Sequence, residues 1–293
     1  MSEKFPLPKA ELEAKIAKGE IDTVVVAMCD MQGRLVGKRL DAKYFLSDVL
    51  KHGTEGCNYL LAVDVDMNTV PGYAMSSWEK GYSDFAMIPD LNTLRLIPWQ
   101  PGAALLLADV TWLDHSDVVA SPRQILRKQI KALADAGMKA MVGTELEFVV
   151  YNNTYEQAFT KGYKDLTPSN QYNVDYSILG GSRIEPLLRA IRLGMSGAGM
   201  NVESVKGECN FGQHEIAFKY SEALNSCDNH VIYKNGAKEI AAASGYALTF
   251  MAKPNQKEGN SSHIHLSFRG LKDELVMADD KDKEHGLSDV GRS

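Results

Sequence analysis

The chain has 293 residues, 44% of them hydrophobic and 24% charged, which is typical of a globular protein long enough for a large core or two domains. Its net charge of -6, with scattered Lys and Arg residues, excludes the basic surface of a nucleic-acid-binding protein. No apolar run approaches the length of a membrane span and the N-terminal segment has no signal core, so we expect no membrane partner and a cytoplasmic location. The four cysteines show no C-x-x-C spacing and are expected to be reduced thiols.

The first part of the chain predicts a short helix followed by strands and loops. The helix covers residues 8–19, and residues 21–40 form two apolar runs around a turn at Asp30 to Gly33, the pattern of a β-hairpin. Short apolar runs separated by Pro89, Pro98 and Pro101 follow. We therefore expect a small, sheet-rich domain over residues 1–118.

The second part alternates helices with strands. Ser121 as N-cap, Pro122 at the first helical position and Gly137 as the stop predict a helix that leads into a strand at 142–150. Later segments predict helices at 183–199 and 221–245 and strands at 200–208, 247–254 and 263–268. We place a domain boundary before the first of these helices and expect an α+β or α/β domain over residues 119–293.

Glu145 and Glu147 lie two positions apart in an otherwise apolar strand. Because side chains alternate faces along a strand, both carboxylates point one way while Leu146 and Phe148 point the other. Their α-carbons are then roughly 7 Å apart, and two ionised carboxylates that close repel unless a cation lies between them. A divalent metal is one explanation. The other explanation is an ordinary amphipathic strand with a solvated polar face. Taken by themselves, the two glutamates favour this second explanation.

The strand at 263–268 also has a polar face. Alternation puts His263, His265 and Ser267 on this face, and Ile264 and Leu266 on the other. A single histidine is more often a structural residue than a ligand. The polar face gains significance only if further acidic residues converge on it.

Residues 202–218 supply those acids, Glu203, Glu208 and Glu215. An unbroken strand would set Glu208 and Glu215 on opposite faces, whereas a turn at Gly212 folds both toward one site, so a hairpin is expected. Several carboxylates with one or two imidazoles suit Mg²⁺ or Mn²⁺ better than zinc. Their number implies two or more cations, the arrangement that holds phosphate oxygens for transfer.

Four segments together resemble the glutamine synthetase family over essentially the whole chain: SDFAMIPDLNTLRLIPW, GTELEF, VESVKGECNFGQHEIAF and FMAKPNQKEGNSSHIHLSF. The resemblance implies an α+β fold, with a small β-grasp-like N-terminal domain and a larger catalytic α/β domain built on a curved antiparallel sheet. It also implies a homo-oligomeric ring of the dodecamer type, in which the N-terminal domain of one subunit completes the site of the next.

The resemblance also implies roles for the acids and histidines. Glu147, Glu208 and Glu215 would hold a first metal, and Glu145 and His263 a second. The positions at which the family handles ATP are Glu203, His265 and Ser267. Gly259 falls in the loop that receives glutamate, and Asp64 and Asp66 are loose candidates for a catalytic aspartate.

The implied activity is that of a ligase of nitrogen metabolism and glutamine biosynthesis. The γ-carboxylate of glutamate attacks the γ-phosphate of ATP, and ammonia or a primary amine then displaces phosphate from γ-glutamyl phosphate. Ammonia-using members more often have Gly-Ser-Gly-Met-His where this chain has Gly259-Asn260-Ser261-Ser262-His263. The difference favours the branch that makes γ-glutamyl amides of alkylamines or polyamines.

Family members continue beyond the point at which this sequence stops, so the resemblance implies a C-terminally truncated catalytic domain. Ser288-Asp289 resembles the cap of a further helix. The missing part would carry arginines for ATP and glutamate. No local substitute for them is expected, because Arg123, Arg127, Arg189 and Arg192 fall on predicted helices. We expect little or no ligase turnover by this chain alone, and exposed apolar strands.

Three alternatives remain. A catalytically silent relative would keep the fold for structure or regulation, and would usually lose site acids that are present in this chain. A two-metal phosphohydrolase would need a metal-bound water and Asp-rich motifs. A phosphagen kinase would need several arginines around ATP.

Overall fold

The computed structural model describes residues 5–79 and 81–292, which divide into two compact units. The first unit continues to Ile125 and includes Leu193–Met200 and Val231–Gly236. The second comprises Leu126–Arg192, Asn201–His230 and the chain from Ala237 onward. The boundary at residue 118 stays a prediction, because this division follows contacts that cross it.

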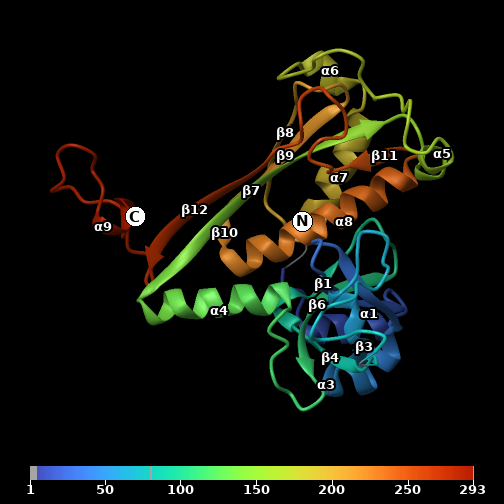
Figure 1. The fold of residues 1–293 in the computed structure, drawn as a ribbon, viewed down its shortest axis with the longest axis vertical. Coiled ribbons are helices and arrows are strands. Elements are labelled where there is room, and N and C mark those ends of the chain that lie inside the picture. The colour runs from blue at the N-terminus through green and yellow to red at the C-terminus, as the bar shows by residue number, and fades with distance from the viewer. Residues whose placement is uncertain (1–4, 80, 293) are drawn as a thin grey trace. The chain divides into compact units, whose positions relative to one another are not determined.

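A six-stranded mixed sheet organises the first unit. Its strands are β1 (Thr23–Cys29), β2 (Leu35–Asp41), β3 (Thr54–Cys57), β4 (Asp84–Pro89), β5 (Arg95–Leu96) and β6 (Ala103–Trp112). The order is β2-β1-β6-β4-β3, with β5 also paired to β6, and the β1/β6 pair is parallel. Figure 1 labels β1, β6, β4 and β3 of this sheet. Helix α1 (Lys9–Ala17) precedes β1, and short helices lie between later strands: α2 (Ala42–Tyr44), η1 (Phe45–Val49), α3 (Leu50–His52), η2 (Asn58–Leu61) and η3 (Leu91–Thr93).

The predicted hairpin and first helix are confirmed. β1 and β2 pair antiparallel, and Asp30 in the turn is buried. Its carboxylate accepts hydrogen bonds from the backbone N–H of Gln32 at 2.9 Å and of Arg34 at 2.8 Å. Gly33 has a φ of +68°, a conformation that favours glycine. The core of this unit packs Leu12 of α1 with apolar side chains of β1, β4 and β6, including Val26, Phe85 and Leu106.

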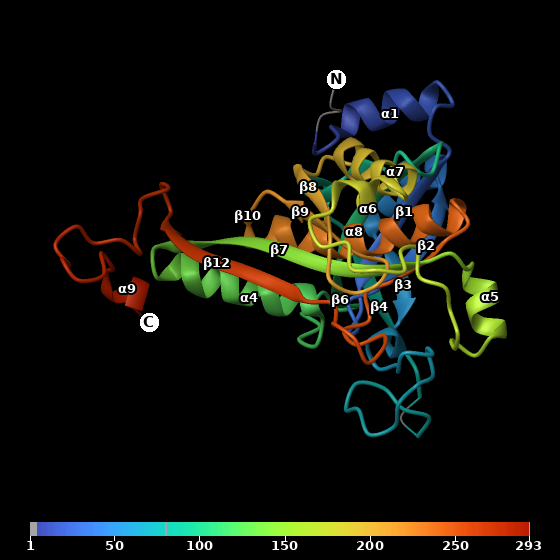
Figure 2. The ribbon, with the colours of Figure 1, turned by 90° about the horizontal axis from the view of Figure 1, so that it is seen from above.

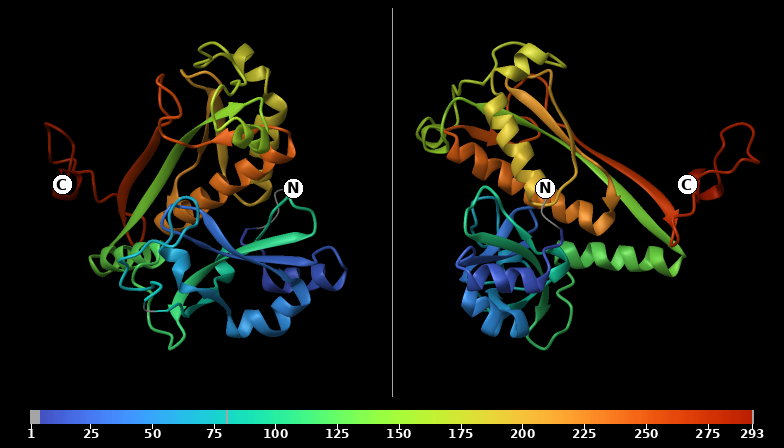
Figure 3. Two further views of the ribbon diagram at one scale, coloured as in Figure 1. Left: turned by 45° about the vertical axis from the view of Figure 1, so that its right-hand side comes forward. Right: turned by 180° about the vertical axis from the view of Figure 1, so that it is seen from behind.

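An antiparallel sheet organises the second unit, and β7 (Met138–Tyr151) is its central strand. On one side β7 pairs with β9 (Gln213–Phe218) and with the short β10 (Ser221–Glu222), and β9 pairs in turn with β8 (Val202–Gly207). On the other side β7 pairs with β11 (Ala247–Thr249) and β12 (Ser262–Gly270). Figure 3 shows β7 and β12 running side by side. Two polar-faced strands thus meet along their length.

The described residues of this part of the chain also form six helices: α4 (Pro122–Asp135), α5 (Tyr155–Thr160), α6 (Ile178–Ser182), α7 (Glu185–Gly197), α8 (Ala223–Ala243) and α9 (Asp289–Arg292). The Leu126, Ile130 and Leu133 stripe of α4 packs on Ala140 of β7 and on Phe268 of β12. Figure 2 shows α4 running alongside β7 and β12. α8 begins two residues later than predicted, because Ser221 and Glu222 pair with β7.

The other expectations for the second unit are largely met. Ser288 caps α9, since its hydroxyl accepts a hydrogen bond from the N–H of Gly291 at 3.1 Å. The four cysteines are free. Ile264 and Leu266 on the apolar face of β12 are exposed, which agrees with the expectation of exposed apolar strands. Among the helices described, we find none that combines the length and the apolar character needed to cross a bilayer.

Arg123 provides a test of the first unit. Its guanidinium donates to Asp109 at 2.5 Å and to Asp90 at 2.8 Å, and its side chain is 5% exposed. Arg123→Ala leaves two partly buried carboxylates without this partner, so we expect unfolding to become easier by about 3–5 kcal/mol. Urea denaturation followed by circular dichroism measures the change. Lys131→Ala, which removes an exposed ion pair to Asp135 on the same helix, is the control and should cost less than about 0.5 kcal/mol; equal effects would contradict the prediction.

Candidate metal centre

β7 and β9 place three carboxylates on one face of the sheet. Glu147 lies opposite Glu215 in the register, and Glu145 lies opposite Ala217. Leu146 and Phe148 point to the other face, where they are buried. The alternation predicted for this strand is therefore confirmed.

His214 belongs to the buried face, next to Phe148, with the two rings 6.2 Å apart. Burial lowers the pKa of His214 to about 4, so the imidazole is neutral at neutral pH. It backs the acidic face without adding positive charge to it. The polar centre thus rests on an uncharged core.

The β8/β9 hairpin brings a fourth carboxylate, Glu208, to the same face. Gly212 forms the predicted turn, with a φ of +69°, and a Cβ there would meet the carbonyl oxygen of Val150 at 2.5 Å. Across the turn, the Glu208 N–H donates to the Gln213 carbonyl at 3.0 Å. One carboxylate oxygen from each of Glu147, Glu208 and Glu215 lies within 4.8 Å of the others. We call these three residues the acidic cluster.

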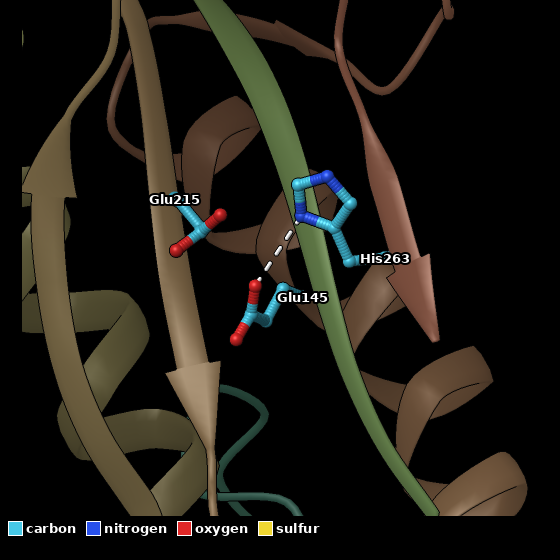
Figure 4. A group of neighbouring side chains, drawn as sticks. All are labelled: Glu145, Glu215 and His263. Carbon is cyan, nitrogen blue, oxygen red and sulfur yellow. Dashed lines mark ion pairs between the residues drawn. The ribbon is translucent and has the colours of Figure 1, made fainter. Parts of the chain in front are cut away.

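β12 adds imidazoles from the other side of β7. His263 is the register partner of Glu145, and its Nδ1 lies 3.3 Å from the Glu145 carboxylate. Glu145, Glu215 and His263 each offer one ligand atom within 4.8 Å of the others (Figure 4). We call these three the mixed group. Glu215 belongs to both groups, which the sequence did not indicate.

Electrostatics at the centre favour a cation. Burial is the largest effect that raises the pKa of Glu215, and the nearby charges of Glu145 and Glu147 raise it further, while Lys206 and His263 oppose this. The positive charge nearby thus compensates these close, partly buried carboxylates only in part. The donors are carboxylate oxygens with one imidazole, a set that fits Mg²⁺ or Mn²⁺.

The loop before β12 orients Glu147. This residue is 5% exposed, and its carboxylate accepts hydrogen bonds from the Gln213 side-chain amide at 2.6 Å and from the Ser261 N–H at 2.9 Å. Gln213 also donates to the Gly259 carbonyl at 2.8 Å. A Cβ on Gly259 would meet the Ala252 carbonyl oxygen at 2.5 Å, so only glycine fits without movement of the loop.

Sequence reasoning missed Gln213 and Lys206. Gln213 lies two positions before Glu215 on β9, and Lys206 lies two positions before Glu208, so alternation already indicated that both share the acidic face. Lys206 forms an ion pair with Glu208 and its Nζ lies 3.9 Å from Glu215. The structure also groups Asp175 and Cys209 with Glu208.

The other predicted site residues lie near the centre or apart from it. His265 Nε2 is 3.2 Å from the Glu145 carboxylate, a contact that the implied ATP role did not include. Ser267 is on the same face of β12, further along at Met141. Glu203 lies at the register shift of β8 and is exposed.

Asp64 and Asp66 belong to the first unit, in a turn. The Asp64 carboxylate accepts from the N–H groups of Asp66 and Asn68, each at 2.9 Å. Hydrogen bonds from Asn68 are the main cause of the lowered pKa of Asp64. This carboxylate thus stabilises its own turn, and a catalytic role for either aspartate stays a prediction.

The four arginines predicted to fall on helices do so, on α4 and α7. Arg269, in contrast, shares the polar face of β12 with His263 and His265. It lies opposite Lys139 in the register and donates to the Tyr220 hydroxyl at 3.4 Å. A site-bearing strand therefore does carry an arginine, which sequence reasoning overlooked, and the expectation that no residue replaces the family's arginines stays a prediction.

The fold, with its candidate acidic centre, is that of a glutamine synthetase-type domain. The family model described as "Glutamine synthetase, catalytic domain" matches residues 119–293. The chain belongs to the glutamine synthetase family.

Similar proteins include members of its γ-glutamyl amine ligase branch. A γ-glutamylethanolamide synthetase GlnA4 of Streptomyces coelicolor is 62% identical over 287 residues, which cover 98% of this chain and 61% of that protein. A glutamate–isopropylamine ligase of a Pseudomonas species is 36% identical, over 94% of this chain and 60% of that protein. The chain thus spans about three fifths of the length of these curated relatives.

Solved structures support the fold. The chain matches a GmaS/ADP complex with a TM-score of 0.78 and 23% identity, over 94% of this chain and 59% of that one. It matches a structure described as a novel glutamine synthase homolog with a TM-score of 0.77 and 17% identity, over 92% and 60%. The α+β glutamine synthetase-like fold is therefore confirmed.

Glu215 is the residue whose removal affects both groups. Glu215→Gln removes one anionic ligand from each, so we expect Mn²⁺ affinity to fall at least tenfold, or about 1.4 kcal/mol, without loss of fold. Electron paramagnetic resonance of free Mn²⁺ measures binding, and circular dichroism checks the fold. Glu203→Gln, an exposed carboxylate on the same hairpin, is the control and should leave Mn²⁺ binding unchanged. Unchanged binding in the Glu215 variant would remove Glu215 from the metal site.

Proposed function

We propose that this protein is an ATP-dependent ligase that joins the γ-carboxylate of glutamate to a primary amine. The observation that carries the proposal is that the acidic cluster and the mixed group converge on one sheet face of a glutamine synthetase family member. The relatives named for γ-glutamylethanolamide and isopropylamine support the reaction type.

The proposed metal ligands are those implied by the resemblance, now with Glu215 shared. Glu147, Glu208 and Glu215 would hold one Mg²⁺ or Mn²⁺, and Glu145, Glu215 and His263 another. Bound there, the cations would supply positive charge for the phosphate oxygens of ATP. The chain's own part is to hold and orient the ligands, as Gln213 and Ser261 do for Glu147.

The nucleophile belongs to the substrate. The γ-carboxylate oxygen of glutamate attacks the γ-phosphorus of ATP, ADP leaves, and γ-glutamyl phosphate forms. The neutral amine then attacks the activated carbonyl carbon, the bond from that carbon to the phosphate oxygen breaks, and the amine loses a proton to the departing phosphate as the amide forms. No side chain of the protein is consumed or covalently modified in either step.

We propose the substrate contacts that the resemblance implies. His265 and Ser267 share the polar face of β12 with His263 and, with Glu203, would contact ATP. Gly259 would lie beside glutamate, because its loop is tied through Gln213 to Glu147. Asp64 or Asp66 would contribute from the N-terminal unit of a neighbouring subunit.

We propose a small alkylamine or amino alcohol as the second substrate, with ammonia as the alternative. The support is the Asn260-Ser261 sequence of the loop and the names of the relatives. Asn260 is itself fixed, since its side chain donates to the Met251 carbonyl at 2.8 Å and accepts from Gln213 at 3.0 Å.

Other features of the full protein are also proposals. The hairpin of β1 and β2 beside the parallel β6 supports a β-grasp-like N-terminal domain. A homo-oligomeric ring follows from the family resemblance, and a cytoplasmic location from the proposed use of ATP and glutamate. The silent-relative alternative is disfavoured, because Glu145, Glu147, Glu208, Glu215 and His263 are all present and converge.

We expect this chain alone to show little or no turnover. In the described part of the second unit, Arg127, Arg189 and Arg192 lie on helices, and Arg269 contacts Tyr220. These positions offer few cationic side chains for ATP phosphates. Incubation of the 293-residue protein with ATP, glutamate, Mn²⁺ and ethanolamine, followed by mass spectrometry, should therefore give no γ-glutamyl product above background; robust synthesis would overturn this expectation.

A chimera tests the function itself. This chain replaces the matching segment of the Streptomyces coelicolor relative, which supplies the remaining length. We expect ATP-dependent γ-glutamyl amide formation, reduced at least a hundredfold by Glu215→Gln and unchanged by Lys219→Met, which alters an exposed residue. Comparison of ethanolamine, isopropylamine and ammonia ranks the amines. A folded chimera that binds Mn²⁺ but forms no amide with any of them would refute the proposed function.

A further inference from the structure

Lys206 places a positive charge against the acidic cluster. It lies on β8 directly opposite Glu215 in the register, so its side chain enters the acidic face. Its ammonium is paired with Glu208 Oε1 and lies 3.9 Å from Glu215 Oε1. The Lys206 side chain is 24% exposed, and those of Glu208 and Glu215 are 14% and 9% exposed. Water therefore screens these charges only in part.

This contact offsets repulsion among the carboxylates of the acidic cluster. Glu147, Glu208 and Glu215 bring three carboxylates within 4.8 Å, and two of them face the Lys206 ammonium. Without a positive charge, carboxylates that close favour separation of the β7, β8 and β9 side chains. Lys206 thus does for the metal-free protein part of what a divalent cation would do.

The ammonium and a divalent cation compete for the same oxygens. A carboxylate oxygen directed at an ammonium hydrogen is poorly placed to coordinate a metal, and two cations at that spacing repel. Lys206 has a second contact available, because its Nζ lies 4.9 Å from the centre of the Tyr176 ring. This cation–π contact involves the ammonium in the same position as its ion pairs, so it adds to them.

We propose that Lys206 is an internal counter-cation, which stabilises the acidic cluster in the metal-free protein and must leave it when Mg²⁺ or Mn²⁺ binds. The inference rests on the metal binding in the proposed function. It assigns Lys206 a regulatory effect on metal affinity, since metal binding must break the Lys206 ion pairs. Lys206 would oppose binding of the cation proposed to lie between Glu147, Glu208 and Glu215.

The test compares Lys206→Met, Lys206→Arg and the control Lys219→Met in the 293-residue protein. Lys206→Met keeps the aliphatic length but removes the charge, so we expect Mn²⁺ to bind about tenfold more tightly, equivalent to about 1.4 kcal/mol. The same variant should melt at a lower temperature in EDTA and gain more thermal stability from saturating Mn²⁺ than the wild type. Lys206→Arg keeps the charge and should behave as the wild type, as should Lys219→Met.

The outcomes separate this inference from the proposed function. A folded wild-type protein that takes up no Mn²⁺ in titration calorimetry refutes the metal site on which the proposed function depends. Mn²⁺ uptake by the wild type with equal or weaker uptake by Lys206→Met overturns the counter-cation role alone. If Lys206→Met does not fold, Lys206→Gln, which removes the charge, is compared with Lys206→Arg, which keeps it. Mn²⁺ affinity in Lys206→Gln that is equal to or weaker than in Lys206→Arg overturns the inference.

Discussion

Repulsion among carboxylates on one sheet face is the constraint on which the centre depends. β7 contributes Glu145 and Glu147, and the β8/β9 hairpin contributes Glu208 and Glu215. An antiparallel register fixes these side chains against a buried apolar face, so they cannot separate without loss of core packing. The sheet therefore holds negative charge at a density that only cations can neutralise, and Lys206 neutralises part of it.

The supporting residues act by limiting movement of the ligands. Gln213 and the Ser261 N–H both donate to Glu147, which fixes one carboxylate at the centre of the sheet. Glycine at 212 and at 259 allows backbone carbonyls to approach where any side chain would collide. A preorganised ligand loses little conformational freedom when it binds a cation, which favours binding.

Much of this centre was predictable from local sequence, and the rest required pairing between distant strands. Period-two alternation predicted the shared face of Glu145 and Glu147, and Gly212 predicted the hairpin. Alternation does not state which strands are neighbours, so the sharing of Glu215 between two groups and the contact of His265 with Glu145 emerged only from the register. The start of α8 was misplaced because pairing with β7 outweighs the helical preference of Ser221 and Glu222.

A carboxylate common to two ligand sets links their occupancies. A cation that draws the Glu215 carboxylate toward one set changes the free energy with which the other set binds. Thermodynamic linkage makes this effect reciprocal: the factor by which the first ion alters the affinity for the second equals the factor in the opposite direction. For the two cations of the proposed function, this single side chain would couple the two ligand sets, and their titration curves would differ from those of independent sites.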